Sequence, residues 1–443
     1  GRSNLLAKAN RLDEALSAFD KALVHHPELL EALIGRGNIL KTQRKYAEAI
    51  VAYDAALAVK QTSPEALTGR GNVLSELGRL AEAGAEYDLA LSLNPKLAEA
   101  WLGKGLVHTK RDEFDLANDA FHTALGLNPG LAEAWVGLGS LFSQIENPRD
   151  ALNAYERAIQ IKPLLAEAWL GQGTVQLLCK LPDQASESLA EALRLKPDLP
   201  FATGDFLHAK AWNCDWSNHA AEWQNCSDSV DRGLPVITAF PSLSLGLSPK
   251  QLLACAKLAR IASLKNTSDP LWRGEIYSHR RIRVAYISCD FKEHPVSYLS
   301  AGVFEQHDRS VFETIGISVG INDKSPMRAR MSTAFDHFID GYRMANEALA
   351  SSLREREIDI VVDLGGNTAG SRLDLLALRP APVQATYLGY AATTGADFVD
   401  YMIADQTVIP PNDQKFYSEK IAYLPSCYLP NDRCRAIGGP VDR

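Results

Sequence analysis

The sequence predicts an α-solenoid of paired helices followed by an α/β unit built on a parallel sheet. Two observations predict this fold class. Small, aromatic and proline residues recur every 34 residues between Leu33 and Pro197, which indicates a row of repeated helix pairs. From Ile282 onward, short apolar strands alternate with helical segments, which indicates βαβ units and a sheet covered on both faces.

The composition is that of a globular protein. The 443 residues are 46% hydrophobic and 23% charged, with a formal net charge of -8. This acidic balance disfavours nucleic acid as a partner, and no apolar run reaches the roughly 18 residues that span a membrane. The 7 cysteines lack C-x-x-C spacing, so we expect no metal site and reduced thiols in a cytoplasmic protein.

Six positions define the repeat, and each has a packing reason. Glycine and two alanines leave room where helices cross, a large side chain fills the gap beside them, and proline ends the second helix. The pattern is typical of tetratricopeptide repeats, so we expect residues 1–197 to form half a repeat and five complete ones. The matching residues, besides the EAL or EAW segments, are Gly37, Gly71, Gly105, Gly139 and Gly173; Ala49, Ala83, Ala117, Ala151 and Ala185; Ala56, Ala90, Ala124, Ala158 and Ala192; Tyr53, Tyr87, Phe121, Tyr155 and Leu189; Pro95, Pro129, Pro163 and Pro197.

Two asparagines follow the repeat glycine and are candidates for a peptide groove. Asn38 and Asn72 occupy equivalent positions in the first two complete repeats. Their amides could hold the backbone of a bound peptide on a concave surface, or they could be solvated groove residues. Both interpretations fit the sequence, and protein acceptors are the partners that such a groove would take.

Beyond Pro197 the period fades, and residues 198–280 are expected to form a helical cap and connector. In residues 281–443, strands alternating with helices predict a doubly wound, Rossmann-like parallel sheet. The expected strands are 282–288, 312–319, 359–364 and 383–390, followed by short ones at 401–405 and 421–425; the expected helices are 325–340, 346–358 and 370–379.

Three loops that follow strands are expected to meet at one edge of this sheet. Their sequences are "SCDFKEHPVSYLS", "DLGGNTAGSRLD" and "LGYAATTGADFVDY". Ligands of parallel sheets bind beyond the carboxyl ends of the strands, and backbone amides in such loops suit an anion or a sugar. We therefore expect a binding site here, with ordinary turns as the alternative. His294 in the first loop could bind a sugar or phosphate, act as an acid or base, or bond a loop carbonyl.

The same loops carry a family resemblance. The segments "DFKEHPVSYLS", "RPAPVQATYLGYAATTGADFVDYMIAD" and "YSEKIAYLPSCYLPND" closely resemble the O-linked N-acetylglucosamine transferases, which include the plant SPINDLY-type enzymes. The connector segment "AWNCDWS" is similar to that of bacterial members. The resemblance implies repeats joined to a GT-B glycosyltransferase that moves a sugar from UDP-GlcNAc or another nucleotide sugar to Ser or Thr of proteins with inversion. It implies no cofactor and no metal.

By this resemblance His294, in the "HP" motif, is the catalytic residue. Asn367 stands where bacterial relatives commonly have His, and Ala391–Ala392 replace a Pro-Gly pair of the family. The residues that the resemblance places near the acceptor and donor sugar are Gly389, Thr393, Thr394, Gly395, Asn367 and Asn431.

The resemblance also implies a second lobe that binds the nucleotide, for which residues 281–443 supply only the N-terminal, incomplete lobe. We therefore expect a piece of a longer enzyme, cut within a repeat and before the second lobe. Such a piece is expected to be inactive alone and to bind a nucleotide sugar only together with the second lobe. The alternative is a non-catalytic repeat scaffold whose degenerate transferase lobe binds proteins.

Overall fold

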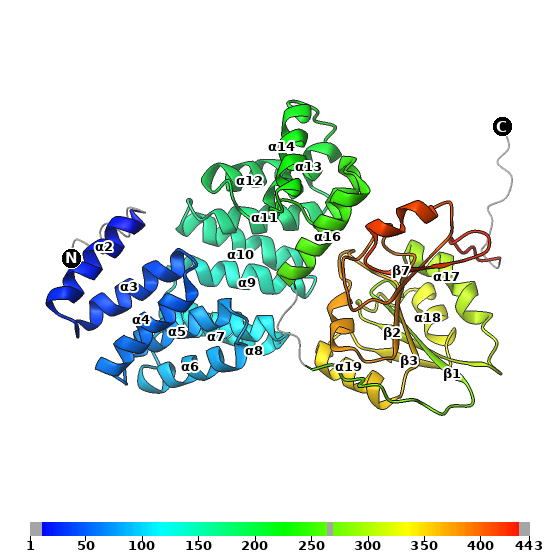
Figure 1. Cartoon of the computed structure of the whole chain (residues 1–443), viewed down its shortest axis with the longest axis horizontal. Coiled ribbons are helices and arrows are strands. Elements are labelled where there is room, and N and C mark those ends of the chain that lie inside the picture. The colour runs from blue at the N-terminus through cyan, green and yellow to red at the C-terminus, as the bar shows by residue number, and fades with distance from the viewer. Residues whose placement is uncertain (1–10, 264–268, 434–443) are drawn as a thin grey trace. The chain divides into compact units, whose positions relative to one another are not determined.

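The computed structural model describes residues 11–263 and 269–433, and the chain forms two compact units, Gly1–Pro197 and Asp198–Arg443 (Figure 1). Each unit is described by itself. The expected connector and sheet lobe lie in one unit rather than two. Residues 1–10, at the start of the expected half repeat, and residues 434–443, at the end of the expected lobe, lie outside the described residues.

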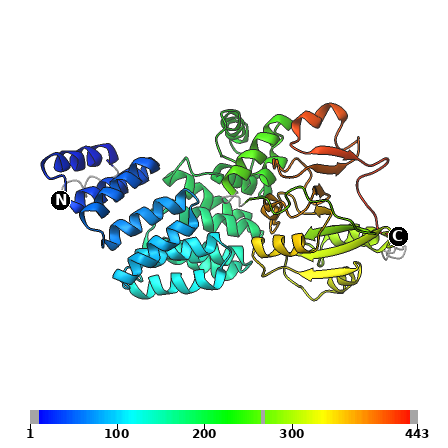
Figure 2. The same cartoon turned by 60° about the horizontal axis from the view of Figure 1, so that its bottom comes forward.

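The first unit is a stack of helix pairs, as the 34-residue period predicts (Figure 2). A single helix, α2 (Leu12–His25), precedes five pairs, so the second helix of the half repeat is confirmed. The pairs are α3 (Leu30–Thr42) with α4 (Tyr46–Val59), α5 (Pro64–Glu76) with α6 (Leu80–Leu93), α7 (Ala98–Lys110) with α8 (Phe114–Leu127), α9 (Ala132–Gln144) with α10 (Pro148–Ile161), and α11 (Ala166–Leu178) with α12 (Pro182–Leu195).

The aromatic side chain of each of the first four complete repeats packs between two glycines, whereas Leu189 of the fifth lies against Gly173 alone among the glycines. Tyr87 lies against Gly71 of its own repeat and Gly103 of the next, where an added Cβ would come within 2.4 Å of the ring. The ring therefore joins neighbouring repeats as well as the two helices of one repeat. The second glycine also recurs every 34 residues, although the prediction used only the first; its members are Gly35, Gly69, Gly103, Gly137 and Gly171.

The second unit begins with a small helical layer. Leu207, Cys226, Val230, Ile237 and Cys255 form its buried core. The helix over residues 219–231 and the short ones after it were not predicted. The helices are α13 (Ala202–Trp212), α14 (His219–Asp231), α15 (Ala239–Ser242), η1 (Leu243–Leu245) and α16 (Pro249–Ser263).

A seven-stranded, wholly parallel sheet follows, in the order β3-β2-β1-β4-β5-β6-β7. The parallel Rossmann-like fold is thus confirmed, and both of its faces are covered. Its strands are β1 (Ile282–Ser288), β2 (Phe312–Ser318), β3 (His337–Asp340), β4 (Ile360–Asp363), β5 (Val383–Tyr387), β6 (Tyr401–Ala404) and β7 (Lys420–Tyr423). One face packs on α17 (Pro295–Glu305) and α18 (Pro326–Thr333), and the other on α19 (Asn346–Glu355) and η2 (Leu373–Leu378); η3 (Pro411–Phe416) precedes β7.

Two predicted helices of this unit were wrong in type or extent. The helix expected over 325–340 ends at Thr333, and its last residues form the edge strand β3 instead. Phe338 and Ile339 pack into the cores on opposite faces of the sheet, which is strand rather than helix geometry. The helix expected over 370–379 is a six-residue 3₁₀ helix.

Candidate functional site

The candidate site lies where the strand order reverses, between β1 and β4. From β1 the chain builds outward through β2 and β3, and from β4 it builds the other way, which opens a crevice at the carboxyl ends of the strands. The three predicted loops leave the neighbouring strands β1, β4 and β5 at this edge. The prediction that the three loops lie at one edge of the sheet is therefore confirmed.

His294 caps the N-terminus of α17 from the loop after β1. Its Nδ1 accepts a hydrogen bond from the N–H of Val296 at 3.3 Å, rather than bonding a loop carbonyl. Because Nδ1 serves as the acceptor, the neutral ring carries its proton on Nε2. The side chain is 39% exposed, so a substrate can reach an N–H donor whose ring is already oriented.

Asp290 is a site residue that the sequence analysis missed. Its Oδ2 lies 3.6 Å from Nδ1 of His294, and its side chain is 13% exposed. Its carbonyl accepts a hydrogen bond from the hydroxyl of Ser297 in the first turn of α17. Its signal in the sequence is an aspartate two residues after an apolar strand and four residues before the histidine.

The loop after β4 turns around a buried carboxyl group. Asp363 accepts a hydrogen bond from the N–H of Gly366 at 2.6 Å, and Gly366 has a φ of +57°, which glycine adopts without strain. Burial raises the pKa of Asp363 to about 6, although the N–H groups of Gly366 and Gly365 oppose this rise. A buried carboxyl group thus sets the shape of the loop that carries Asn367.

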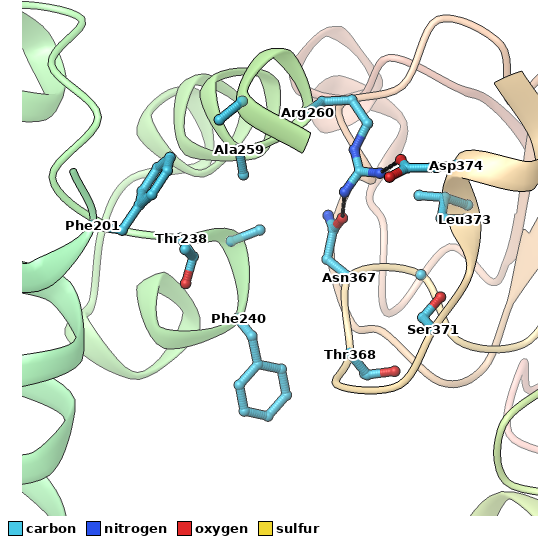
Figure 3. Close-up of a pocket in the computed structure, with 13 residues that line it drawn as sticks. Phe201, Thr238, Phe240, Ala259, Arg260, Asn367, Thr368, Ser371, Leu373 and Asp374 are labelled. Carbon is cyan, nitrogen blue, oxygen red and sulfur yellow. Dashed lines mark hydrogen bonds and ion pairs between the residues drawn. The ribbon is translucent and has the colours of Figure 1, made fainter. Parts of the chain in front are cut away.

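Asn367 joins three segments through its amide. Its Oδ1 accepts from Nη2 of Arg260 on α16 at 3.1 Å, and its Nδ2 donates to the carbonyl of Thr394 at 3.1 Å (Figure 3). Arg260 also forms an ion pair with Asp374. Asn367 therefore links α16, the β4 loop and the β5 loop, and its predicted contact with a substrate stays a prediction.

The loop after β5 is held by close packing and by buried hydrogen bonds. A Cβ at Gly389 would lie 1.9 Å from the carbonyl oxygen of Leu364, and one at Gly395, whose φ is +72°, would lie 2.5 Å from the backbone of Ala256. Both glycines therefore have a backbone role. Thr393 and Thr394 are buried and donate hydrogen bonds to the carboxylate of Glu419, which lies directly before β7.

Asn431 lies further along, in the segment that follows β7, and is exposed. The hydroxyl of Tyr387, at the end of β5, donates to the carbonyl of Tyr428 at 2.5 Å. Asp432 forms an ion pair with Arg330 of α18 at 2.6 Å. The segment is thus fixed to the lobe on both sides of Asn431.

A cavity of about 420 Å³ borders the Asn367 loop. One wall is mainly apolar and includes Phe201 and Phe240, and the opposite wall carries Arg260, Asn367 and Ser371 (Figure 3). Phe201 has a φ of +65°, a strained conformation for a bulky residue. The cavity suits a ligand that offers both apolar and hydrogen-bonding groups.

In the repeat unit, the two predicted asparagines share one arrangement. The hydroxyl of Tyr53 donates to Oδ1 of Asn38, and that of Tyr87 donates to Oδ1 of Asn72, both at 2.7 Å. Each amide is thus oriented by a repeat tyrosine and keeps its two N–H donors for other partners. Whether a peptide uses these donors stays a prediction.

Within residues 11–263 and 269–433, no group of three or more His, Cys, Asp and Glu residues is arranged to hold a metal ion. The helices of this same part of the chain are all too short or too polar to cross a lipid bilayer.

Two family profiles match the chain, one for each unit. Residues 252–437 match glycosyl transferase family 41, and residues 1–64, 34–98, 68–132 and 136–200 match the tetratricopeptide repeat. The first match begins within α16, inside the expected connector, in agreement with the contacts of Arg260 and Ala256 with the loops of the sheet.

The named relatives that the chain resembles are also glycosyltransferases by name. The chain is 32% identical over 241 residues to the probable UDP-N-acetylglucosamine–peptide N-acetylglucosaminyltransferase SEC of Arabidopsis thaliana, covering 51% of this chain and 25% of the relative. It is 36% identical over 170 residues to the SPINDLY protein of the same plant, covering 38% of this chain and 18% of the relative. The chain thus spans a quarter or less of the length of these relatives.

Among solved structures, a mutant of the Thermobaculum terrenum O-GlcNAc transferase matches with a TM-score of 0.49 and 25% identity, over 78% of this chain and 61% of that one. The family profiles and the named relatives agree. Over the matched residues the chain is thus similar to the O-linked N-acetylglucosamine transferases, with tetratricopeptide repeats before a region that matches glycosyl transferase family 41.

Proposed function

We propose that the protein transfers N-acetylglucosamine from UDP-GlcNAc to Ser or Thr hydroxyls of proteins, with inversion at the anomeric carbon. The match of residues 252–437 to glycosyl transferase family 41 carries this proposal. The lobe would be the N-terminal one of a GT-B enzyme, acting in the cytoplasm with a nucleotide-binding second lobe. Its crevice at the β1–β4 switch point is where a parallel sheet binds its ligand.

In this reaction the hydroxyl oxygen of the acceptor forms a bond to the anomeric carbon as the bond from that carbon to the phosphate oxygen breaks. UDP leaves with the bonding electrons, and the hydroxyl proton passes to a base that we do not assign. His294 would donate its Nε2–H to an oxygen of the reacting groups, and its bond with Val296 fixes the ring for this task.

The substrate-side roles of the other residues follow from the loops that hold them. The β5 loop would shape the backbone beside the acceptor and the donor sugar through Gly389, Gly395 and the adjacent threonines. Asn367 and Asn431 would lie at the borders of this substrate site. The repeat unit would recruit the acceptor protein, and Asn38 and Asn72 would donate hydrogen bonds to its backbone. No metal ion would take part, because the charge of the diphosphate would be met by the second lobe.

A transfer assay tests the proposal directly. The protein, together with the region that supplies the nucleotide site, is incubated with radiolabelled UDP-GlcNAc, a protein extract and EDTA. Label should enter proteins and be released by alkaline β-elimination, as an O-linked sugar is. No labelling either with EDTA or with added divalent cation would contradict the enzyme proposal, and labelling only with added divalent cation would contradict the metal-free reaction.

A second candidate function is a repeat scaffold with a degenerate lobe. It is favoured by one observation, which is that Asn367 replaces a family histidine and both ends of its amide have partners inside the protein. In a scaffold, His294→Ala would leave partner binding unchanged and there would be no turnover to lose. Sugar transfer by the wild-type protein would exclude this alternative.

A further inference from the structure

Glu419 is a buried carboxylate with no assigned role in either proposed function. Its side chain approaches the β5 loop from the residue before β7, and Glu419 is 4% exposed. Its Oε1 accepts from the N–H of Thr394 at 2.7 Å and from the hydroxyl of the same residue, and its Oε2 accepts from the hydroxyl of Thr393 at 2.8 Å. The partners in these bonds are hydroxyl and amide groups rather than a cation.

These hydrogen bonds offset the free-energy cost of burying the carboxylate of Glu419. A buried carboxylate is destabilising unless several donors surround it, and here three donors come from two consecutive loop residues. The N–H of Ser418 also donates to the hydroxyl of Thr393 at 3.1 Å. Glu419 therefore acts on a short piece of backbone rather than on the fold as a whole.

The same piece of backbone is held from its other side. Nδ2 of Asn367 donates to the carbonyl of Thr394, and Gly395 packs against the backbone of α16 at Ala256. The N–H and the carbonyl of Thr394 are thus both occupied, one by the β7 side and one by the β4 loop. This arrangement leaves the loop little freedom to move relative to β4 and β7.

We propose that Glu419 is the positioning residue of the transfer site: its carboxylate fixes Thr393 and Thr394, and thereby the backbone of the Gly389–Gly395 loop that the substrate meets. The two threonines then serve as internal ligands of Glu419 and do not contact the sugar through their hydroxyls. This inference rests on the proposed transferase function for its effect on turnover, but not for its effect on the loop.

Hydrogen exchange of the loop amides, followed by mass spectrometry, tests the positioning without any substrate. In Glu419→Ala, residues 390–396 should exchange about tenfold faster or more, because a buried charge-assisted bond contributes roughly that factor to local opening. Thr394→Val, which keeps the carboxylate, should give a smaller increase, and Thr394→Ser should restore wild-type exchange. Unchanged exchange of this loop in both Glu419→Ala and Thr394→Val would overturn the proposal.

The matched control is Asp400→Asn. Asp400 accepts the N–H of Gln384 at 2.8 Å and pairs with Arg379, so it anchors the opposite end of β5. This variant should lower the thermal midpoint while leaving exchange of the Gly389–Gly395 loop unchanged. Equal loosening of that loop in the control would mean that general destabilisation, and not Glu419, explains the result.

Turnover gives the second readout. In the transfer assay, Glu419→Ala should lower kcat/KM for the protein acceptor about tenfold or more, and Asp400→Asn should stay within about twofold of wild type. A loosened loop with unchanged kcat/KM would overturn the role in the reaction. Absence of transfer by the wild-type protein would instead refute the proposed function, and the exchange result would still decide whether Glu419 fixes the loop.

Discussion

In the repeat unit, four aromatic rings make the same contact four times, each between two glycines of neighbouring helices. In the sheet unit, two buried carboxyl groups, Asp363 and Glu419, each hold a different loop by a different set of donors. The first kind of contact is apolar and repeated, and the second is polar and occurs once. The comparison teaches that the repeats obtain their stability from interchangeable units, whereas the crevice depends on single residues.

The largest expected effect on stability lies in the repeats. Tyr87→Ala removes a ring that fills the space between Gly71 and Gly103, and we expect it to lower the free energy of unfolding by about 3–5 kcal/mol. Urea denaturation, followed by circular dichroism, measures this change. Glu82 lies on the same helix as Tyr87 and its partner is Arg79 in an exposed ion pair, so Glu82→Gln is the control and should have a much smaller effect. Equal effects of the two variants would show that the ring does not join the repeats.

In the sheet unit, Asp363 predicts a dependence of stability on pH. Its folded pKa of about 6 lies above the ordinary 3.8, so the folded protein keeps this proton to higher pH and loses stability as pH rises from about 4 to about 6. Asp363→Asn should remove this loss, which amounts to on the order of 3 kcal/mol between pH 4 and pH 7. Denaturation of both proteins at the two pH values measures the difference.

The control is Asp336, for which the expected change of stability with pH has the opposite sign. Burial raises the pKa of Asp336, but the N–H of Thr314 and the Arg309 guanidinium outweigh burial and hold this pKa below its ordinary value. The stability that Asp336 contributes is therefore lost as pH falls, and Asp336→Asn should reduce the loss of stability in acid. If both variants changed the pH profile in the same direction, the roles given to the two carboxyl groups would be wrong.

The smallest expected effect concerns partner binding by the repeats. Asn72→Ala removes a half-buried amide oriented by the hydroxyl of Tyr87, so the affinity for an acceptor protein should fall about fivefold, the value of one hydrogen bond. Fluorescence anisotropy with a labelled acceptor measures this affinity. Ser140, which follows the repeat glycine at the equivalent position of a later repeat, supplies a control substitution to Ala. Unchanged affinity in Asn72→Ala would favour a solvated asparagine without a groove role.

The same contrast explains how much could be predicted from the sequence. Each helix pair of the repeats was predicted because one packing solution recurs every 34 residues, so chance similarity at one position is corrected by the others. The meeting of the three loops was predicted because each follows a strand of a parallel sheet, and the carboxyl ends of such strands lie at the same edge. The strand at His337–Asp340 was missed because four residues without clear alternation look like the end of a helix.

The partners of the candidate residues could not be predicted. Glu419 lies 25 residues beyond Thr394, and Arg260 lies 107 residues before Asn367, so only the folded chain brings each pair together. Asp290 is different, because its spacing of four residues from His294 was visible in the sequence. Buried hydrogen bonds between distant segments depend on tertiary packing, which local patterns do not encode.

The most direct test of the account compares two histidines of the sheet unit in the transfer assay. His294→Ala should lower kcat about 100-fold or more, because it removes an oriented donor from the crevice. His337→Ala, at the amino end of β3 and 53% exposed, should leave kcat within about twofold of wild type. Equal activity of His294→Ala and wild type would contradict the central claim that the crevice at the β1–β4 switch point is the transfer site.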